Sequence, residues 1–200
     1  IGLPAFFIYY ALDNGENYTE QIENFKAGQS YISLIYISIF GILTPLINTQ
    51  FSENAKASWI YKMMPTKTAG PMLSGNLKSV LVKFGLPTIF IASVITIAIG
   101  GWQTGRSIFV GLLNTLLLTF LYTLWKMKTT PFSKKWEDQS KGNQTSTVFI
   151  FMFLIGIIGL AHYFLLKSAL EIAVWSVVCS VLIFVLHRYI HAMNWEEIRE

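Results

Sequence analysis

The chain has 200 residues, of which 53% belong to the hydrophobic set and only 13% are charged. A soluble globular domain carries about a quarter charged residues, so this composition excludes an ordinary soluble enzyme. The formal net charge is +4, but Lys and Arg are gathered in short segments between long uncharged runs, which is typical of a protein embedded in a bilayer and not of one that binds nucleic acid.

Five uncharged windows are each long enough for one membrane-spanning helix. About 20 apolar residues, rising about 1.5 Å each, cross the hydrocarbon core of a bilayer. The sequence therefore predicts an all-α, polytopic membrane protein, a single transmembrane domain over residues 1–200 with about six helices in a bundle. The chain is apolar from Ile1 onward, so we expect it to start partway through the first of these helices. The expected spans are 1–12, 31–50, 84–101, 107–125, 148–166 and 172–190.

The distribution of Lys and Arg gives the expected orientation, because cytoplasmic loops of membrane proteins retain these residues. The segments 51–83, 126–147 and 187–200 fall on one side of the membrane and hold twelve Lys and Arg, whereas the other side holds three. We therefore expect a multi-pass membrane protein with a cytoplasmic C-terminus. The lipid bilayer is its first expected partner.

The segment 51–83 is the longest stretch between two expected spans, too apolar for a solvated linker and too polar to span a membrane. Residues 53–64 contain no Gly or Pro and are expected to form a short helix. This helix stops before Pro65, because the residue before a proline avoids helical backbone angles. Pro71 suits the first position of a second helix. The pattern predicts two short helices lying at the cytoplasmic interface, with a turn at residues 65–70 between them and the second helix leading into the next span.

Two interpretations of this segment remain open. In the first, it is a basic interfacial loop whose lysines hold the helix ends near anionic headgroups. In the second, it is a docking element. Trp59 and Tyr61 are large amphipathic side chains of the type enriched in binding hot spots, and they are set beside Glu53, Lys56 and Lys62.

The segment also resembles a known arrangement, that of the permease subunits of ABC-2 type exporters. In that family a helical cytoplasmic segment lies between the second and third of six spans. It has an acidic residue near its start, a Gly-Thr pair, a proline farther along, and then Gly and Lys entering the next span. The matching positions in this sequence are Glu53, Ala57 and Ser58 loosely at the Gly-Thr pair, Pro65, Gly75 and Lys78.

The sequence also departs from the family pattern. Trp59 and Ile60 stand where Leu-Glu is typical, and two residues separate Gly75 from Lys78. The stretch ASWIYKMMP, together with a Thr-Pro-Phe-Ser loop at residues 130–133, more closely resembles a branch of bacterial membrane proteins allied to these exporters.

The resemblance implies a permease subunit in the bacterial inner membrane, paired with a second permease half as a homodimer or heterodimer. The 51–83 segment would then act as a coupling helix that docks into a separate cytoplasmic nucleotide-binding ATPase. ATP and Mg²⁺ would bind to that partner, and this chain would carry no cofactor, metal or catalytic residue of its own. On this hypothesis Trp59 and Lys62 join the matching positions as docking residues.

None of the expected spans carries Asp, Glu, Lys or Arg in its middle. Ion-coupled carriers place ionisable groups at membrane depth, where these groups bind or relay the coupling ion. A self-sufficient proton- or sodium-driven carrier is therefore not expected.

Two other functions stay open. One is a membrane-integral enzyme acting on lipid head groups, in which His187 and His191, one helical turn apart, work with Glu196 and Glu197. His162 is expected at the far end of its span from this pair, and the sequence has no HExxH motif, so a metal site built from the three histidines is not expected. The other function is a non-catalytic membrane scaffold.

Overall fold

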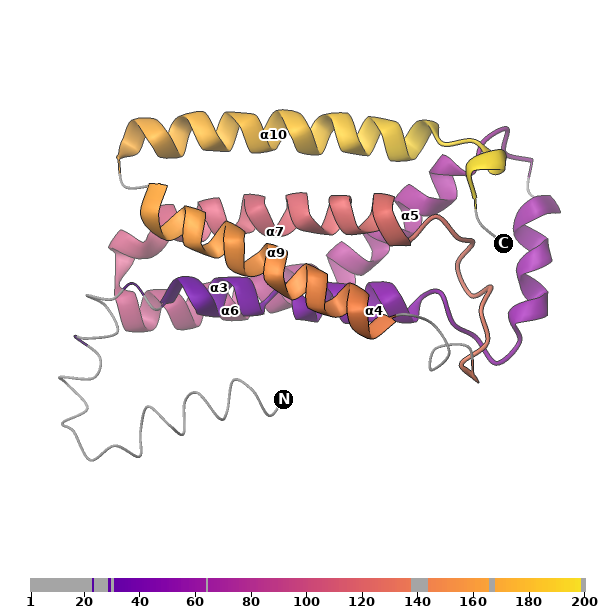
Figure 1. The fold of residues 1–200 in the computed structure, drawn as a ribbon, viewed down its shortest axis with the longest axis horizontal. Helices are drawn as coiled ribbons and strands as arrows, with labels where there is room; N and C mark the ends of the chain where they lie inside the picture. The colour runs from indigo at the N-terminus through magenta and orange to yellow at the C-terminus, as the bar shows by residue number, and fades with distance from the viewer. Residues whose placement is uncertain are drawn as a thin grey trace.

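The computed structural model describes residues 31–63, 65–137, 144–165 and 168–198, together with Glu23 and Gln29. These residues form an all-α helical bundle (Figure 1), which confirms the expected fold class. The expected helix over residues 1–12 lies outside the described residues. Within the described part, four helices are long and apolar enough to cross a membrane: Tyr31–Asn48, Gly70–Gly100, Trp102–Lys126 and Ala169–Ala192. A shorter apolar helix, Phe149–Phe164, accompanies them.

The first described span consists of helix α3 (Tyr31–Ile37) and helix α4 (Phe40–Asn48), separated by a short turn. The Ser38 hydroxyl sits in that turn and donates to the carbonyl of Ile35 at 2.5 Å. The same carbonyl also accepts from the Ser38 amide at 3.2 Å, and the Ile39 amide donates to the Tyr36 carbonyl at 3.2 Å, so backbone hydrogen bonds run through the turn. The two helices therefore continue one another with their polar backbone groups partnered.

Helix α5 (Gly70–Val80), the π-helical turn η2 (Leu81–Gly85) and helix α6 (Leu86–Gly100) form one continuous helix. Pro87 lies in the first turn of α6. Its backbone nitrogen carries no hydrogen and cannot donate to a carbonyl of the preceding turn. A widened π turn absorbs such a defect, and the Thr88 hydroxyl donates to the Phe84 carbonyl at 2.6 Å. The span expected from residue 84 is thus the second part of a helix that begins at Gly70.

The remaining elements follow in chain order. Gly101, with φ of 76°, turns the chain into the 3₁₀ turn η3 (Trp102–Thr104) and helix α7 (Gly105–Lys126). That left-handed conformation favours glycine. Helix α9 (Gln144–Leu165) precedes helix α10 (Ala169–Ala192), and the turn η4 (Trp195–Glu197) follows it.

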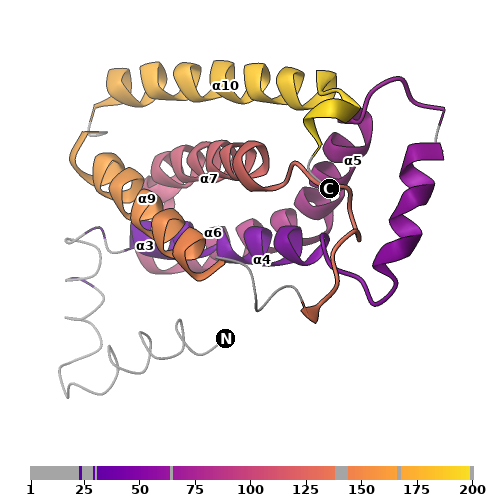
Figure 2. The ribbon, with the colours of Figure 1, turned by 45° about the vertical axis from the view of Figure 1, so that its right-hand side comes forward.

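The elements occupy two opposite ends of the bundle. The ends of α4, α7 and α10 and the start of α5 lie at the same end as the C-terminus (Figure 1). The 3₁₀ helix η1 (Ala55–Met63) lies across this end and stands apart from the long helices in both views (Figures 1 and 2). Turn η3 and the start of α10 lie at the opposite end. We call the first the lysine-rich end, defined by residues 49–69, 127–137 and 193–198.

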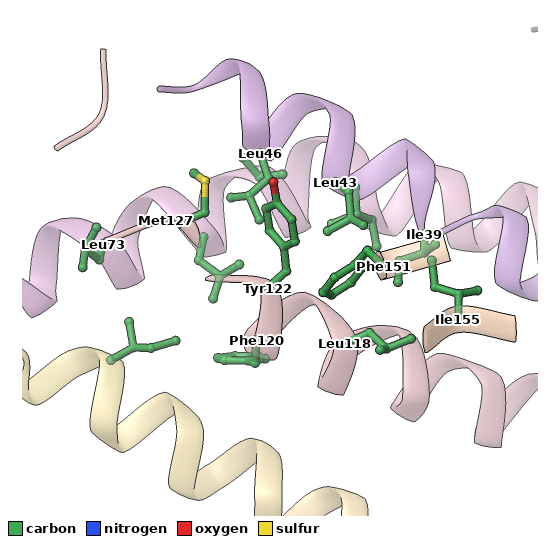
Figure 3. Packing of buried hydrophobic residues seen from close by; sticks show 14 of the residues in the cluster. Ile39, Leu43, Leu46, Leu73, Leu118, Phe120, Tyr122, Met127, Phe151 and Ile155 are labelled. Atoms are coloured by element: carbon green, nitrogen blue, oxygen red, sulfur yellow. The ribbon is translucent and has the colours of Figure 1, made fainter. Parts of the chain in front are cut away.

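An apolar core joins α3, α4, α7 and α9 (Figure 3). Ile39 and Leu118 are fully buried, and the rings of Tyr122 and Phe151 meet edge to face with centroids 5.0 Å apart. Glycine allows close helix contacts around this core, since a Cβ at Gly111 would collide with the Ile35 side chain. By contrast, α10 exposes apolar side chains along most of its length, as expected of a surface against lipid: Leu170, Val174, Val177, Val178, Val181, Leu182, Phe184 and Val185.

Candidate functional site

The docking residues expected from the sequence fall on two different elements. Glu53 lies exposed in the turn before η1, and Ala57, Ser58, Trp59 and Lys62 lie on η1 itself. The sequence predicted a short helix over 53–64 that stops before the proline, and η1 has that position. It is a 3₁₀ helix instead of an α-helix, and such runs are usually short and occur at connections between other elements.

The other three residues lie outside η1. Pro65 is exposed just after it, and Gly75 and Lys78 are exposed on α5. A Cβ added at Gly75 would meet no atom within 4 Å, so packing does not require a glycine there. The structure therefore places Gly75 and Lys78 on a membrane-spanning helix, in a group separate from the η1 residues.

Three apolar side chains on η1 face solvent at the lysine-rich end. Trp59 is 61% exposed, Ile60 55% and Met63 73%, whereas Ala55 at the start of the helix is buried. Neighbouring large apolar side chains left exposed at the end of a bundle mark an interaction surface. We call Trp59, Ile60 and Met63 the η1 surface.

The chain that leads into η1 is bonded to the loop after α7. The Phe132 amide donates to the Thr49 carbonyl at 2.8 Å, and the Lys134 amide donates to the Gln50 carbonyl at 2.9 Å. The Ser52 amide in turn donates to the Lys134 carbonyl at 2.9 Å. The buried Gln50 side chain accepts a further hydrogen bond from Lys134 Nζ at 2.8 Å. The Thr-Pro-Phe-Ser loop singled out in the sequence therefore anchors the start of the η1 segment.

The chain that leaves η1 is bonded to the end of α10. The Gly70 amide donates to the Met193 carbonyl at 3.0 Å, and Trp195 Nε1 donates to the Thr66 carbonyl at 3.3 Å. η1 is thus held between two anchors, one on α4 and the loop after α7, the other on α5 and α10. Hydrogen bonds therefore connect the two flanks of η1 to the ends of α4 and α10, to the start of α5 and to the loop after α7.

A polar network crosses the apolar interior and joins four helices. Its centre is the buried side chain of Asn114 on α7, whose Nδ2 donates to the Tyr36 hydroxyl on α3 at 2.7 Å. Asn114 Oδ1 accepts from Trp175 Nε1 at 2.9 Å and lies 3.5 Å from Cys179 Sγ, both on α10. The Tyr36 hydroxyl lies 3.2 Å from His162 Nδ1 on α9. Hydrogen bonds of this kind fix how the four helices are rotated against one another.

The contacts of this network were not predicted from the sequence. Each member is one polar or aromatic residue in an otherwise apolar span, and which of them meet depends on helix rotation. The available indication was Asn114 itself, an amide close to the middle of a span, because polar groups at membrane depth are rare unless they find a partner.

The histidines separate as the sequence predicted. His187 and His191 stack on α10 near the lysine-rich end, with ring centroids 6.1 Å apart and nearly parallel planes. His162 lies beside Tyr36, near the opposite end of α9. In the described part of the chain, no group of three or more His, Cys, Asp and Glu side chains is placed to hold a metal ion.

Comparisons with protein-family models, with curated proteins and with solved structures found no match to this chain. Two features therefore stand as candidate functional elements on their geometry. One is the η1 surface with its two anchors, and the other is the polar network around Asn114.

Proposed function

We propose that this chain is the membrane-spanning permease subunit of an ATP-driven exporter, with η1 as the element that docks onto a separate nucleotide-binding ATPase. The observation that carries the proposal is the exposure of Trp59 and Met63 on a helix held between two anchors at one end of the bundle. Binding of a partner removes these apolar side chains from water, which favours association.

The two anchors supply the coupling route. Movement of the ATPase displaces η1, and the first anchor passes this displacement to α4 and to the loop after α7. The second anchor passes it to α5 and α10. The network around Asn114 joins α3, α7, α9 and α10, so a rearrangement of the bundle has to break or re-form its hydrogen bonds. ATP and Mg²⁺ belong to the partner in this scheme.

The orientation follows from the charge distribution. The segments 51–83, 126–147 and 187–200 hold twelve of the fifteen Lys and Arg of the chain, and the described parts of these segments reach the lysine-rich end, so this end faces the cytoplasm of the bacterial cell and η1 lies where an ATPase is found. A second permease half, of the same or a related chain, completes the transporter.

Co-purification tests the docking role. The tagged chain is co-expressed with candidate nucleotide-binding ATPases from the same genome, and the retained ATPase is quantified. Removal of a hot-spot side chain costs at least about 2 kcal/mol, so Trp59→Ala, alone or with Lys62→Ala, is expected to lower the apparent affinity about thirtyfold. Trp102→Ala is the matched control, because Trp102 is 86% exposed at the opposite end of the bundle.

The outcomes separate the hypotheses clearly. Equal retention of the ATPase by wild type and the Trp59 variants contradicts docking through η1. Failure of the wild-type chain to retain any nucleotide-binding partner contradicts the exporter function itself and favours an enzyme or a scaffold.

A further inference from the structure

A polar contact joins α5 and α10 near the lysine-rich end. Ser74 Oγ on α5 lies 3.1 Å from His191 Nδ1 on α10, and the same hydroxyl donates to the Pro71 carbonyl at 3.2 Å. A hydroxyl has one proton, so both contacts are satisfied when His191 Nδ1–H donates to Ser74. The other ring nitrogen of His191, Nε2, is then left for another partner.

Further basic side chains lie about one helical turn closer to the middle of both helices. The ring of His187 stacks on that of His191 and meets the ring of Phe120 edge-on, with centroids 6.1 Å apart. Lys78 lies one helical turn beyond Ser74 on α5, and Arg188 follows His187 on α10, so the contact between Ser74 and His191 places both cations at the same end of the packing between α5 and α10. We call these four side chains the α5–α10 basic cluster: Lys78, His187, Arg188 and His191.

No carboxylate in the described part of the chain is paired with any member of the cluster. The nearby Glu197 carboxylate is engaged elsewhere, since it accepts from the Tyr189 hydroxyl at 3.3 Å and from the Asn194 amide at 3.1 Å. Basic groups from two helices held together without a counter-charge repel one another. An anion between them removes that repulsion.

The cluster lies at the level of the lipid headgroups. The continuous helix Gly70–Gly100 has 31 residues. At a rise of about 1.5 Å per residue it is roughly 46 Å long, against a hydrocarbon core of about 30 Å. About ten residues therefore extend beyond the core, and Lys78 is the ninth residue of the helix. Toward the middle of the same two helices the exposed side chains are mostly apolar, with Lys83 on the π turn among the exceptions. The apolar ones include Val82, Leu86, Leu182, Phe184 and Val185.

We propose that the α5–α10 basic cluster binds the phosphate of an anionic phospholipid. Lys78 and Arg188 supply the positive charge and hydrogen-bond donors, the His187 ring supplies one N–H donor, and the acyl chains lie along the apolar surface of α6 and α10. The site is independent of the docking role of η1, and it accounts for the paired histidines without a metal or a catalytic step.

Lipid-dependent thermal stability measures this binding. The purified chain in a neutral detergent is titrated with phosphatidylglycerol, with phosphatidylcholine, or with inorganic phosphate, and apparent affinity is obtained from the rise in melting temperature. Phosphatidylglycerol is expected to stabilise the wild-type protein, and the other two are not. Loss of both cations in Lys78→Gln/Arg188→Gln is expected to weaken the apparent affinity about thirtyfold, equivalent to about 2 kcal/mol.

Two further variants make the test specific. Lys56→Gln/Lys67→Gln removes the same charge from exposed positions at the same end and is expected to leave the affinity unchanged. Lys78→Arg/Arg188→Lys keeps the charge at the cluster and is expected to retain binding, which separates lost binding from lost folding. An equal loss in both Gln pairs would show that surface potential alone attracts the lipid. Stabilisation by inorganic phosphate equal to that by phosphatidylglycerol would identify a soluble anion as the ligand. Either result overturns the proposal.

Discussion

The contact of α5 with α10 gives a sharp prediction about two glycines of one helix. Gly70 begins α5 beside the last turn of α10, and a Cβ built on it lies 2.0 Å from the His191 carbonyl oxygen and 2.6 Å from that of Ile190. Both obstructing atoms belong to the backbone, so no side chain can rotate away. Gly75 lies one and a half turns later on the same helix, and a Cβ there meets nothing within 4 Å.

The two substitutions to alanine are therefore expected to have opposite signs. In Gly70→Ala the helices must separate by more than 1 Å to restore ordinary contact, which strains the bond from the Gly70 amide to Met193 as well. Overpacking and a weakened hydrogen bond together cost about 2–4 kcal/mol. Gly75→Ala changes only the conformational freedom of the chain and is expected to stabilise the helix by about 0.5–1 kcal/mol.

Unfolding of the two variants in mixed detergent micelles, followed by the change in tryptophan fluorescence, compares their free energies of unfolding with that of the wild type. The assay needs no ligand or partner. A Gly70→Ala protein as stable as Gly75→Ala would refute the close backbone approach of α5 to α10.

Two further predictions concern buried amides. Asn114→Leu removes two interhelical hydrogen bonds, one donated to Tyr36 and one accepted from Trp175. Each such bond in a membrane is worth about 0.6 kcal/mol, so the substitution is expected to destabilise the bundle by about 1–2 kcal/mol. An unchanged free energy of unfolding would count against the network. Gln50→Leu removes the acceptor of Lys134 Nζ and is expected to speed hydrogen exchange of the Phe132 and Lys134 amides. Unaltered protection there would show that the backbone bonds alone hold the first anchor.

Much of the architecture could be predicted from the sequence, because charge and length decide where a helix can cross a bilayer. The five spans expected from residue 31 onward each overlap a described helix. The second of these begins well before its expected start at residue 84, because a π turn carries one helix from Gly70 through Pro87.

The contacts between spans could not be predicted in the same way. Tyr36 and Trp175 resemble ordinary span residues until helix rotation brings both to Asn114. The basic cluster arises from the antiparallel register of α5 and α10, which brings Ser74 to His191 across more than a hundred residues of sequence. A single sequence fixes the faces of each helix but not which faces meet.

The proposed function requires that the lysine-rich end face the cell interior. Cysteine labelling measures directly which side of the membrane this end faces. In a Cys179→Ala background, a cysteine is placed by Met63→Cys on η1 or by Trp102→Cys at the opposite end, where the native side chains are 73% and 86% exposed. A membrane-impermeant maleimide added to intact cells is expected to label position 102, and to label position 63 only after the membrane is opened. Labelling of position 63 in intact cells would contradict both the orientation and the docking role of η1.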